Sequence, residues 1–118
     1  MPGIQRIDQN NRRSRCVIHN GMIFLAGQTA SDPGGDIRQQ ARECFAKVDD
    51  LLAQAGSDKT HALSVTIWLS DMADYDGFNE VWDSWIVQGQ SPTRACAKVA
   101  LADPRLRVEL IVIATAAA

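Results

Sequence analysis

The hydrophobic residues of this chain change their spacing twice, and this change restricts the folds that the chain can form. Between residues 36 and 56 they recur at every third or fourth position, as on one face of an α-helix, with Asp36 as the predicted N-cap and Gly56 as the predicted C-cap. Between residues 63 and 70 they occupy every second position, beginning at Leu63, which is typical of a strand with one buried face. Helical spacing returns at residues 75–86 and ends near Gly89.

Five further strands are predicted near the two ends of the chain. Residues 4–8 alternate, and Asn20-Gly21 between residues 16–19 and 22–27 is typical of a tight β-hairpin turn. Residues 93–101 and 107–114 flank the turn sequence Ala102-Asp103-Pro104 and are predicted to pair as a closing hairpin. This order of elements favours an α/β (α+β) fold, with a mixed sheet and two helices packed on one face.

Such an arrangement leaves the other face of the sheet uncovered. Trp68, Ile111 and Ile113 are predicted to lie on that face, and association of subunits is the simplest way to bury them. At 118 residues, the chain has room for a single domain that spans residues 1–118. We therefore expect one domain that forms a homo-oligomer.

Composition and motifs argue against several classes of function. The formal charge of -2 gives no overall attraction for nucleic acid or acidic membranes. No apolar run approaches the roughly 20 residues that span a bilayer, and the amino terminus lacks the apolar core of a secretory signal, so a cytoplasmic location is expected. The three cysteines lack C-x-x-C spacing, and phosphate-loop and dinucleotide motifs do not occur. We expect neither a metal nor an organic cofactor.

Two charged residues interrupt the apolar strands near the end of the chain. Arg94 shares a strand face with Cys96, and Glu109 shares one with Ile111 and Ile113. An arginine can hold a carboxylate through two parallel hydrogen bonds, and a carboxylate in apolar surroundings can activate water. The pair suggests a site for a small carboxylic acid. The alternative is structural, with Arg94 in an ion pair between subunits and Glu109 as a solvated strand residue.

Four segments of the chain resemble the Rid/YjgF family. They are N-G-M-I-F-L-A-G-Q at residues 20–28, F-N-E-V-W at 78–82, S-P-T-R-A-C at 91–96 and V-E-L at 108–110. The resemblance covers nearly the whole chain in the same order. The segments V-I-H-N at residues 17–20 and W-D-x-W at 82–85 resemble the YoaB-like branch more closely than RidA.

This resemblance implies a chorismate-mutase-like, RidA-like domain that forms a homotrimer, with ligand pockets between neighbouring subunits. RidA-type members hydrolyse enamines and imines, such as 2-aminoacrylate and its 2-imino acid tautomer, to 2-oxo acids and ammonia without a cofactor. Carried over by motif, Arg94 would bind the substrate carboxylate, and Glu109 would orient or activate the attacking water. The remaining pocket residues implied by the resemblance are Gly27, Gln28, Asn79 and Cys96.

Two departures from RidA leave the substrate open. Arg13 stands where RidA carries a tyrosine, and residues 31–36 differ from the usual segment. Arg13 either binds a second anionic group of a more acidic imine or is a solvated loop residue. Two function classes remain, an imine deaminase and a non-catalytic trimer that senses a small carboxylate. Glu109 favours the enzyme, because a sensor has no need of a group that activates water.

Three other residues of the predicted site region have two interpretations each. Trp82 and Trp85 stand three apart on the second predicted helix, so at least one of them is expected to pack against the sheet. Cys96 is either a reactive thiol beside Arg94 or a small residue of the pocket wall. We assign Cys96 to the wall, because free cysteine is usually buried.

Overall fold

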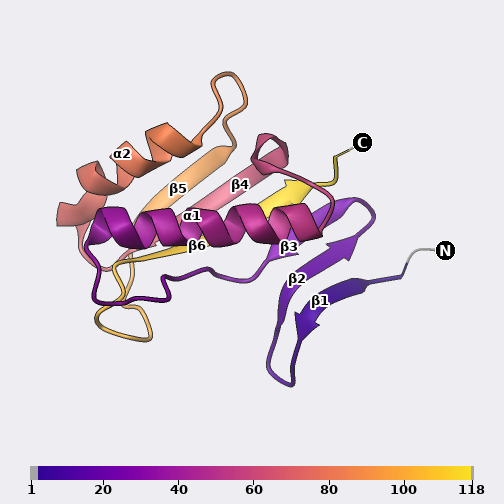
Figure 1. Cartoon of the computed structure of the whole chain (residues 1–118), viewed down its shortest axis with the longest axis horizontal. Helices are drawn as coiled ribbons and strands as arrows, with labels where there is room; N and C mark the ends of the chain where they lie inside the picture. Colours follow the sequence, from indigo (N-terminus) through magenta and orange to yellow (C-terminus); the bar gives the residue numbers. More distant parts are fainter. Residues whose placement is uncertain (1–2, 118) are drawn as a thin grey trace.

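The computed structural model in Figure 1 describes residues 3–117 as a six-stranded sheet with two helices on one face. The strands are β1 (Gln5–Gln9), β2 (Ser14–His19), β3 (Met22–Leu25), β4 (Ala62–Leu69), β5 (Thr93–Lys98) and β6 (Val108–Thr115). The helices are α1 (Ile37–Gln54) and α2 (Tyr75–Trp85), and two short 3₁₀ turns are η1 (Lys59–His61) and η2 (Met72–Asp74). The predicted α/β (α+β) fold with a mixed sheet is confirmed.

The strand order is β1-β2-β3-β6-β4-β5, in which β4 and β5 are parallel and the other described pairs are antiparallel. The predicted closing hairpin of residues 93–101 and 107–114 is therefore wrong. β6 lies between β3 and β4, whereas β5 forms an edge of the sheet. Position explains the difference: β6 buries every second side chain and has backbone partners on both sides, whereas the short β5 has no fully buried residue.

Local chemistry sets the ends of the helices. The carboxylate of Asp36 accepts a hydrogen bond from the backbone N–H of Gln39 at 2.9 Å, which caps α1 as predicted. After the last turn, Gly56 adopts a φ of 77°, and the N–H of Ser57 donates to the carbonyl of Leu52 at 2.8 Å. α2 ends at Trp85, earlier than the predicted end near Gly89.

The core lies between the helices and the sheet. It includes Phe45 and Val48 from α1, Phe78 from α2, and alternate residues of β4 and β6. Leu63 was predicted to belong to the buried face of β4 but is 44% exposed. The cause is an irregularity in the register between Ala62 and Ser64, which places Ala62 in the core instead.

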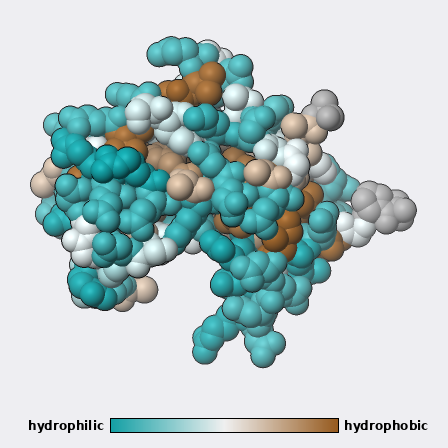
Figure 2. Space-filling view, viewed as in Figure 1, coloured by the Kyte–Doolittle hydropathy of each residue, from teal (hydrophilic) through white to brown (hydrophobic). Residues whose placement is uncertain are grey.

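The face of the sheet away from the helices carries apolar residues that one chain leaves open. The cross-strand pairs on it include Phe24 with Ile113 and Trp68 with Glu109. Phe24 is 44% exposed, and Ile113 is only partly buried. In contrast, Figure 2 shows mainly hydrophilic residues over the helix side.

Within residues 3–117, neither helix combines the length and apolar character that a membrane span needs.

Candidate functional site

Arg94 reaches α2 from the edge strand β5. It pairs with Val65 in the parallel ladder, so its side chain lies on the helix side of the sheet. Its Nη2 donates to Oδ1 of Asn79 at 2.8 Å and lies 3.5 Å from the hydroxyl of Tyr75. The indole ring of Trp82 has its centroid 4.8 Å from the guanidinium carbon. The structure therefore brings together Tyr75, Asn79, Trp82 and Arg94, which we call the Arg94 cluster.

The guanidinium of Arg94 forms no ion pair with any residue of the range 3–117. Several other arginines do, with N–O distances of 2.6 Å for Arg38 and Glu80, 2.8 Å for Arg105 and Asp103, and 3.0 Å for Arg107 and Asp74. The neighbours of Arg94 are instead a neutral amide, a hydroxyl and aromatic rings. Because arginine stays charged at all physiological pH values, a partly buried guanidinium of this kind is suited to an anionic ligand.

Glu109 lies on the opposite face of the sheet, in β6. Its carboxylate packs so closely on Gly27 that a Cβ at that position would overlap Oε2 and would lie 2.9 Å from Cδ. Burial raises the pKa of the Glu109 carboxyl. A carboxylate with a raised pKa is better matched to proton transfer near neutral pH.

Gln28 fixes the segment that contacts Glu109. Its backbone pairs with Leu110, with N–O distances of 2.8 and 3.0 Å, so Gly27 is held beside Glu109. The buried side chain of Gln28 accepts a hydrogen bond from Arg15 at 3.2 Å and donates one to the carbonyl of Ala26 at 2.8 Å. Gly27, Gln28 and Glu109 form the Glu109 cluster. Nothing in the sequence near Arg15 indicates its distant partner Gln28.

The two clusters do not meet within one chain. Arg94 projects to the helix side of the sheet, whereas Glu109 pairs with Trp68 and projects to the open side. Arg94 and Glu109 are predicted from the sequence to belong to one site. One chain holds them on opposite faces of the sheet, so it does not bring both into a single site.

The other two predicted residues are exposed or partly buried. Arg13 lies in the turn between β1 and β2, where its exposed Nη1 donates to the carbonyl of Asp8 at 2.9 Å. Cys96 shares the helix side of the sheet with Arg94. Burial raises the pKa of the Cys96 thiol, and the charge of Arg94 opposes that increase. A thiol with a raised pKa is a poor nucleophile at neutral pH, which favours a role for Cys96 in the pocket wall.

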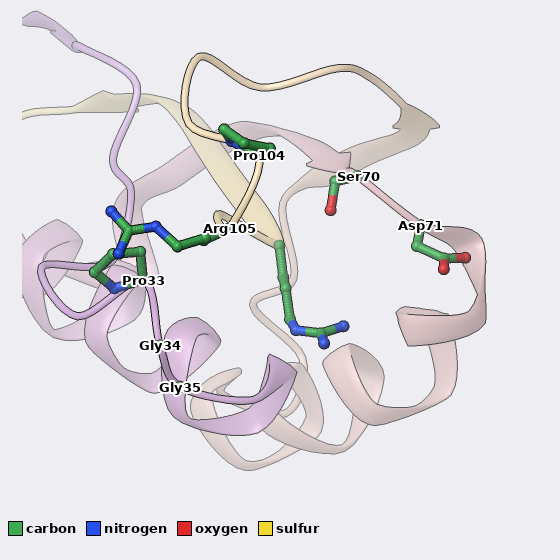
Figure 3. Close-up of a pocket in the computed structure, with 8 residues that line it drawn as sticks. Pro33, Gly34, Gly35, Ser70, Asp71, Pro104 and Arg105 are labelled. Atoms are coloured by element: carbon green, nitrogen blue, oxygen red, sulfur yellow. The ribbon is translucent and has the colours of Figure 1, made fainter.

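A cavity lies at another place, at one end of the sheet (Figure 3). It has a volume of about 530 Å³ and is lined by Pro33, Gly34, Gly35, Ser70, Asp71, Pro104, Arg105 and Arg107. None of the predicted site residues lines it. The buried side-chain amide of Gln40 connects the loops that line this cavity. It donates to the carbonyls of Pro33, Gly35 and Arg105 and accepts from the N–H of Arg107, at 2.8 to 3.2 Å. Both arginines at this cavity already have carboxylate partners.

Within residues 3–117, no three His, Cys, Asp or Glu side chains are grouped as metal ligands.

Comparisons with known proteins give matches over nearly the whole chain. The endoribonuclease L-PSP family model matches residues 3–116. A RutC family protein of Haemophilus influenzae is 40% identical over 116 residues, which cover 95% of this chain and 97% of the relative. The RutC family protein YoaB of Escherichia coli is 34% identical over 111 residues, which cover 94% of this chain and 96% of the relative.

Two further matches bear on activity and fold. A protein of Rattus norvegicus named 2-iminobutanoate/2-iminopropanoate deaminase is 29% identical over 107 residues, which cover 86% of this chain and 77% of the relative. A crystal structure of a YjgF family member from Neisseria meningitidis has a TM-score of 0.96 and 39% identity. That match covers 98% of this chain and 97% of the other.

Proposed function

Since this chain belongs to the endoribonuclease L-PSP family, which includes the RutC and YjgF proteins, we propose that it is a cofactor-free deaminase of small 2-imino acids. The products would be a 2-oxo acid and ammonia. The observation that carries this proposal is the guanidinium of Arg94, which has neutral and aromatic neighbours and no carboxylate partner in residues 3–117. The name of the rat relative supports the reaction type. The formal charge of -2 gives no overall attraction for RNA, which argues against a nuclease activity of this chain.

The complete site would form between two subunits of a homotrimer. One subunit would supply the Arg94 cluster, and the next would supply the Glu109 cluster from its open sheet face. Two observations support this assembly. The clusters lie on opposite faces of one chain, and the open face around Glu109 also carries the apolar side chains of Phe24 and Ile113.

In the proposed reaction, the N–H groups of Arg94 bind the substrate carboxylate and orient the imine. Water attacks the imine carbon, and the carboxylate of Glu109 accepts a proton from that water. The new C–O bond forms as the electron pair of the C=N double bond moves to nitrogen, which takes up a proton. The resulting carbinolamine then forms the C=O bond and releases ammonia, so one water is consumed and no oxidant or reductant is needed.

Backbone and amide groups would complete the pocket. Asn79 already accepts a hydrogen bond from Arg94, so its role in this site is to hold the guanidinium. Gln28 uses its side chain within its own subunit, which leaves the exposed backbone at Gly27 to face the ligand. Cys96 would form part of the wall beside Arg94.

Hydrolysis of imines made in situ by an amino acid oxidase tests this proposal, with ammonia and 2-oxo acid release as the readouts. The parent protein should accelerate hydrolysis over the spontaneous rate, with and without a metal chelator. Glu109→Gln should still bind a 2-oxo acid in calorimetry but should release ammonia about 10²- to 10⁴-fold more slowly.

A parent protein that binds 2-oxo acids without accelerating hydrolysis would contradict the deaminase and would favour the carboxylate sensor. The sensor needs only the Arg94 cluster, which one subunit contains in full.

Sedimentation of the same sample should give three times the mass of the chain, and a stable monomer would contradict the shared site.

A further inference from the structure

Arg94 lies against a wall of aromatic rings on α2. The ring centroids of Tyr75 and Phe78 are 5.9 and 6.0 Å from its guanidinium carbon, and that of Trp82 is closer, at 4.8 Å. A guanidinium within about 6 Å of an aromatic face is attracted to the ring electrons, most strongly to those of tryptophan. Trp82 is therefore the main aromatic partner of Arg94.

Trp82 is itself held firmly by the core. It is 6% exposed, and its ring centroid lies 6.0 Å from that of Phe45, 6.3 Å from that of Phe78 and 5.7 Å from that of Trp85. Dense packing of this kind leaves a side chain few alternative rotamers. The indole is thus a fixed surface, and the long side chain of Arg94 is the partner whose position it can restrict.

A second contact from the same helix restricts the rotation of the guanidinium. Asn79, three residues before Trp82, accepts the 2.8 Å hydrogen bond from Nη2 of Arg94. Within residues 3–117, Nε and Nη1 of Arg94 make no hydrogen bond. One helix therefore fixes the guanidinium at two points and leaves other N–H groups unused.

We propose that Trp82 is a positioning residue that orders the Arg94 guanidinium for a ligand carboxylate. This inference rests on the function proposed above. A guanidinium that is ordered before binding loses less conformational freedom when it binds, and its planar geometry must be aligned to form two parallel hydrogen bonds with a carboxylate. Trp82 thereby sets the affinity for the charged end of the substrate without contacting the reacting carbon.

Trp85 provides a matched control on the same helix. It is also 6% exposed and packs in the same aromatic cluster, with its ring centroid 4.5 Å from that of Phe45. Its Nε1 donates to Asp49 at 2.9 Å, and the cation near its ring is Lys59, at 5.8 Å. Loss of Trp85 should therefore disturb packing to a similar degree without removing a contact to Arg94.

Calorimetry with pyruvate, and with its neutral amide, separates positioning from packing. Trp82→Leu should weaken pyruvate binding roughly 3- to 30-fold, and Trp82→Phe should weaken it less, because phenylalanine retains an aromatic face. Trp85→Leu should lower Tm about as much as Trp82→Leu does, but it should bind pyruvate within about twofold of the parent. Neither leucine variant should change the affinity for the neutral amide. Parent-like pyruvate binding by folded Trp82→Leu, or an equal loss in Trp85→Leu, would overturn the inference.

A ligand-free measurement keeps this inference distinct from the proposed function. The NMR order parameter of the Arg94 Nε–H group should fall in Trp82→Leu and stay unchanged in Trp85→Leu. An unchanged order parameter in both variants would overturn the positioning role. If the parent bound no 2-oxo acid, the proposed function would fail, and the order parameter would still decide whether Trp82 orders Arg94.

Discussion

Replacement of Gly27 by alanine is expected to disable Glu109 without unfolding the protein. A Cβ at position 27 would overlap Oε2 of Glu109 and would lie 2.9 Å from Cδ. Gly27 is not among the glycines with positive φ, so its backbone accepts an L-amino acid. The Glu109 carboxylate is the end of a flexible side chain at a partly exposed position, so it is the group that moves.

The size of the effect follows from this displacement. Cδ must retreat from 2.9 Å to at least the 3.4 Å of an ordinary contact, and Oε2, which overlaps the new atom, must move further. A displacement of about 1 Å in a catalytic group can lower a rate about 10²-fold. We therefore expect kcat for imine hydrolysis to fall about 100-fold in Gly27→Ala. Affinity for a 2-oxo acid should fall much less than kcat, because the guanidinium of Arg94, and not the carboxylate of Glu109, binds the ligand carboxylate in the proposed site.

The assay is steady-state ammonia release from oxidase-generated imines, with Tm measured on the same samples. Gly3→Ala is the matched control, because no atom lies within 4 Å of a Cβ at that position. In a Glu109→Gln background, Gly27→Ala should cause no further loss, since the base is already absent. Parent-like kcat in Gly27→Ala, or a full additional loss in the double variant, would refute this reasoning.

Three further predictions concern the charged residues. Arg94→Lys keeps the charge but loses the planar guanidinium, so kcat/KM should fall roughly 30-fold or more. Arg107→Lys, in an exposed ion pair with Asp74, should stay within about twofold in the same kinetics. Because burial raises the pKa of Glu109, activity should fall on acidification at a pH above the ordinary glutamate value of about 4.3. The residual activity of Glu109→Gln should not show this fall at acidic pH. Arg13→Ala should lower kcat/KM selectively for imines of acidic amino acids, and an equal effect on all imines would contradict a second carboxylate contact.

The sequence alone determined those features that depend on neighbouring residues. Asn20 and Gly21 adopt positive φ angles of 50° and 78°, as the predicted hairpin turn requires. The sequence also predicted the N-cap at Asp36, the glycine at position 56 that ends α1, and the helical spacing of α1 and α2. These features are readable from sequence because capping and side-chain spacing act within one or two turns. The segments that resemble the Rid/YjgF family were also visible without any structure.

The tertiary structure decided which strands pair and which face each charged residue occupies. Alternation shows that Arg94 and Cys96 share a face, but not which face of the sheet it is, because that depends on the strand beside them. The parallel pairing of β5 with β4 placed Arg94 beside α2, and the insertion of β6 between β3 and β4 turned Glu109 to the open side. Both pairings join residues far apart in sequence, and packing of the whole core selects among such pairings. Sequence periodicity could therefore name the two charged residues, but only the assembled sheet shows that one chain holds them on opposite faces.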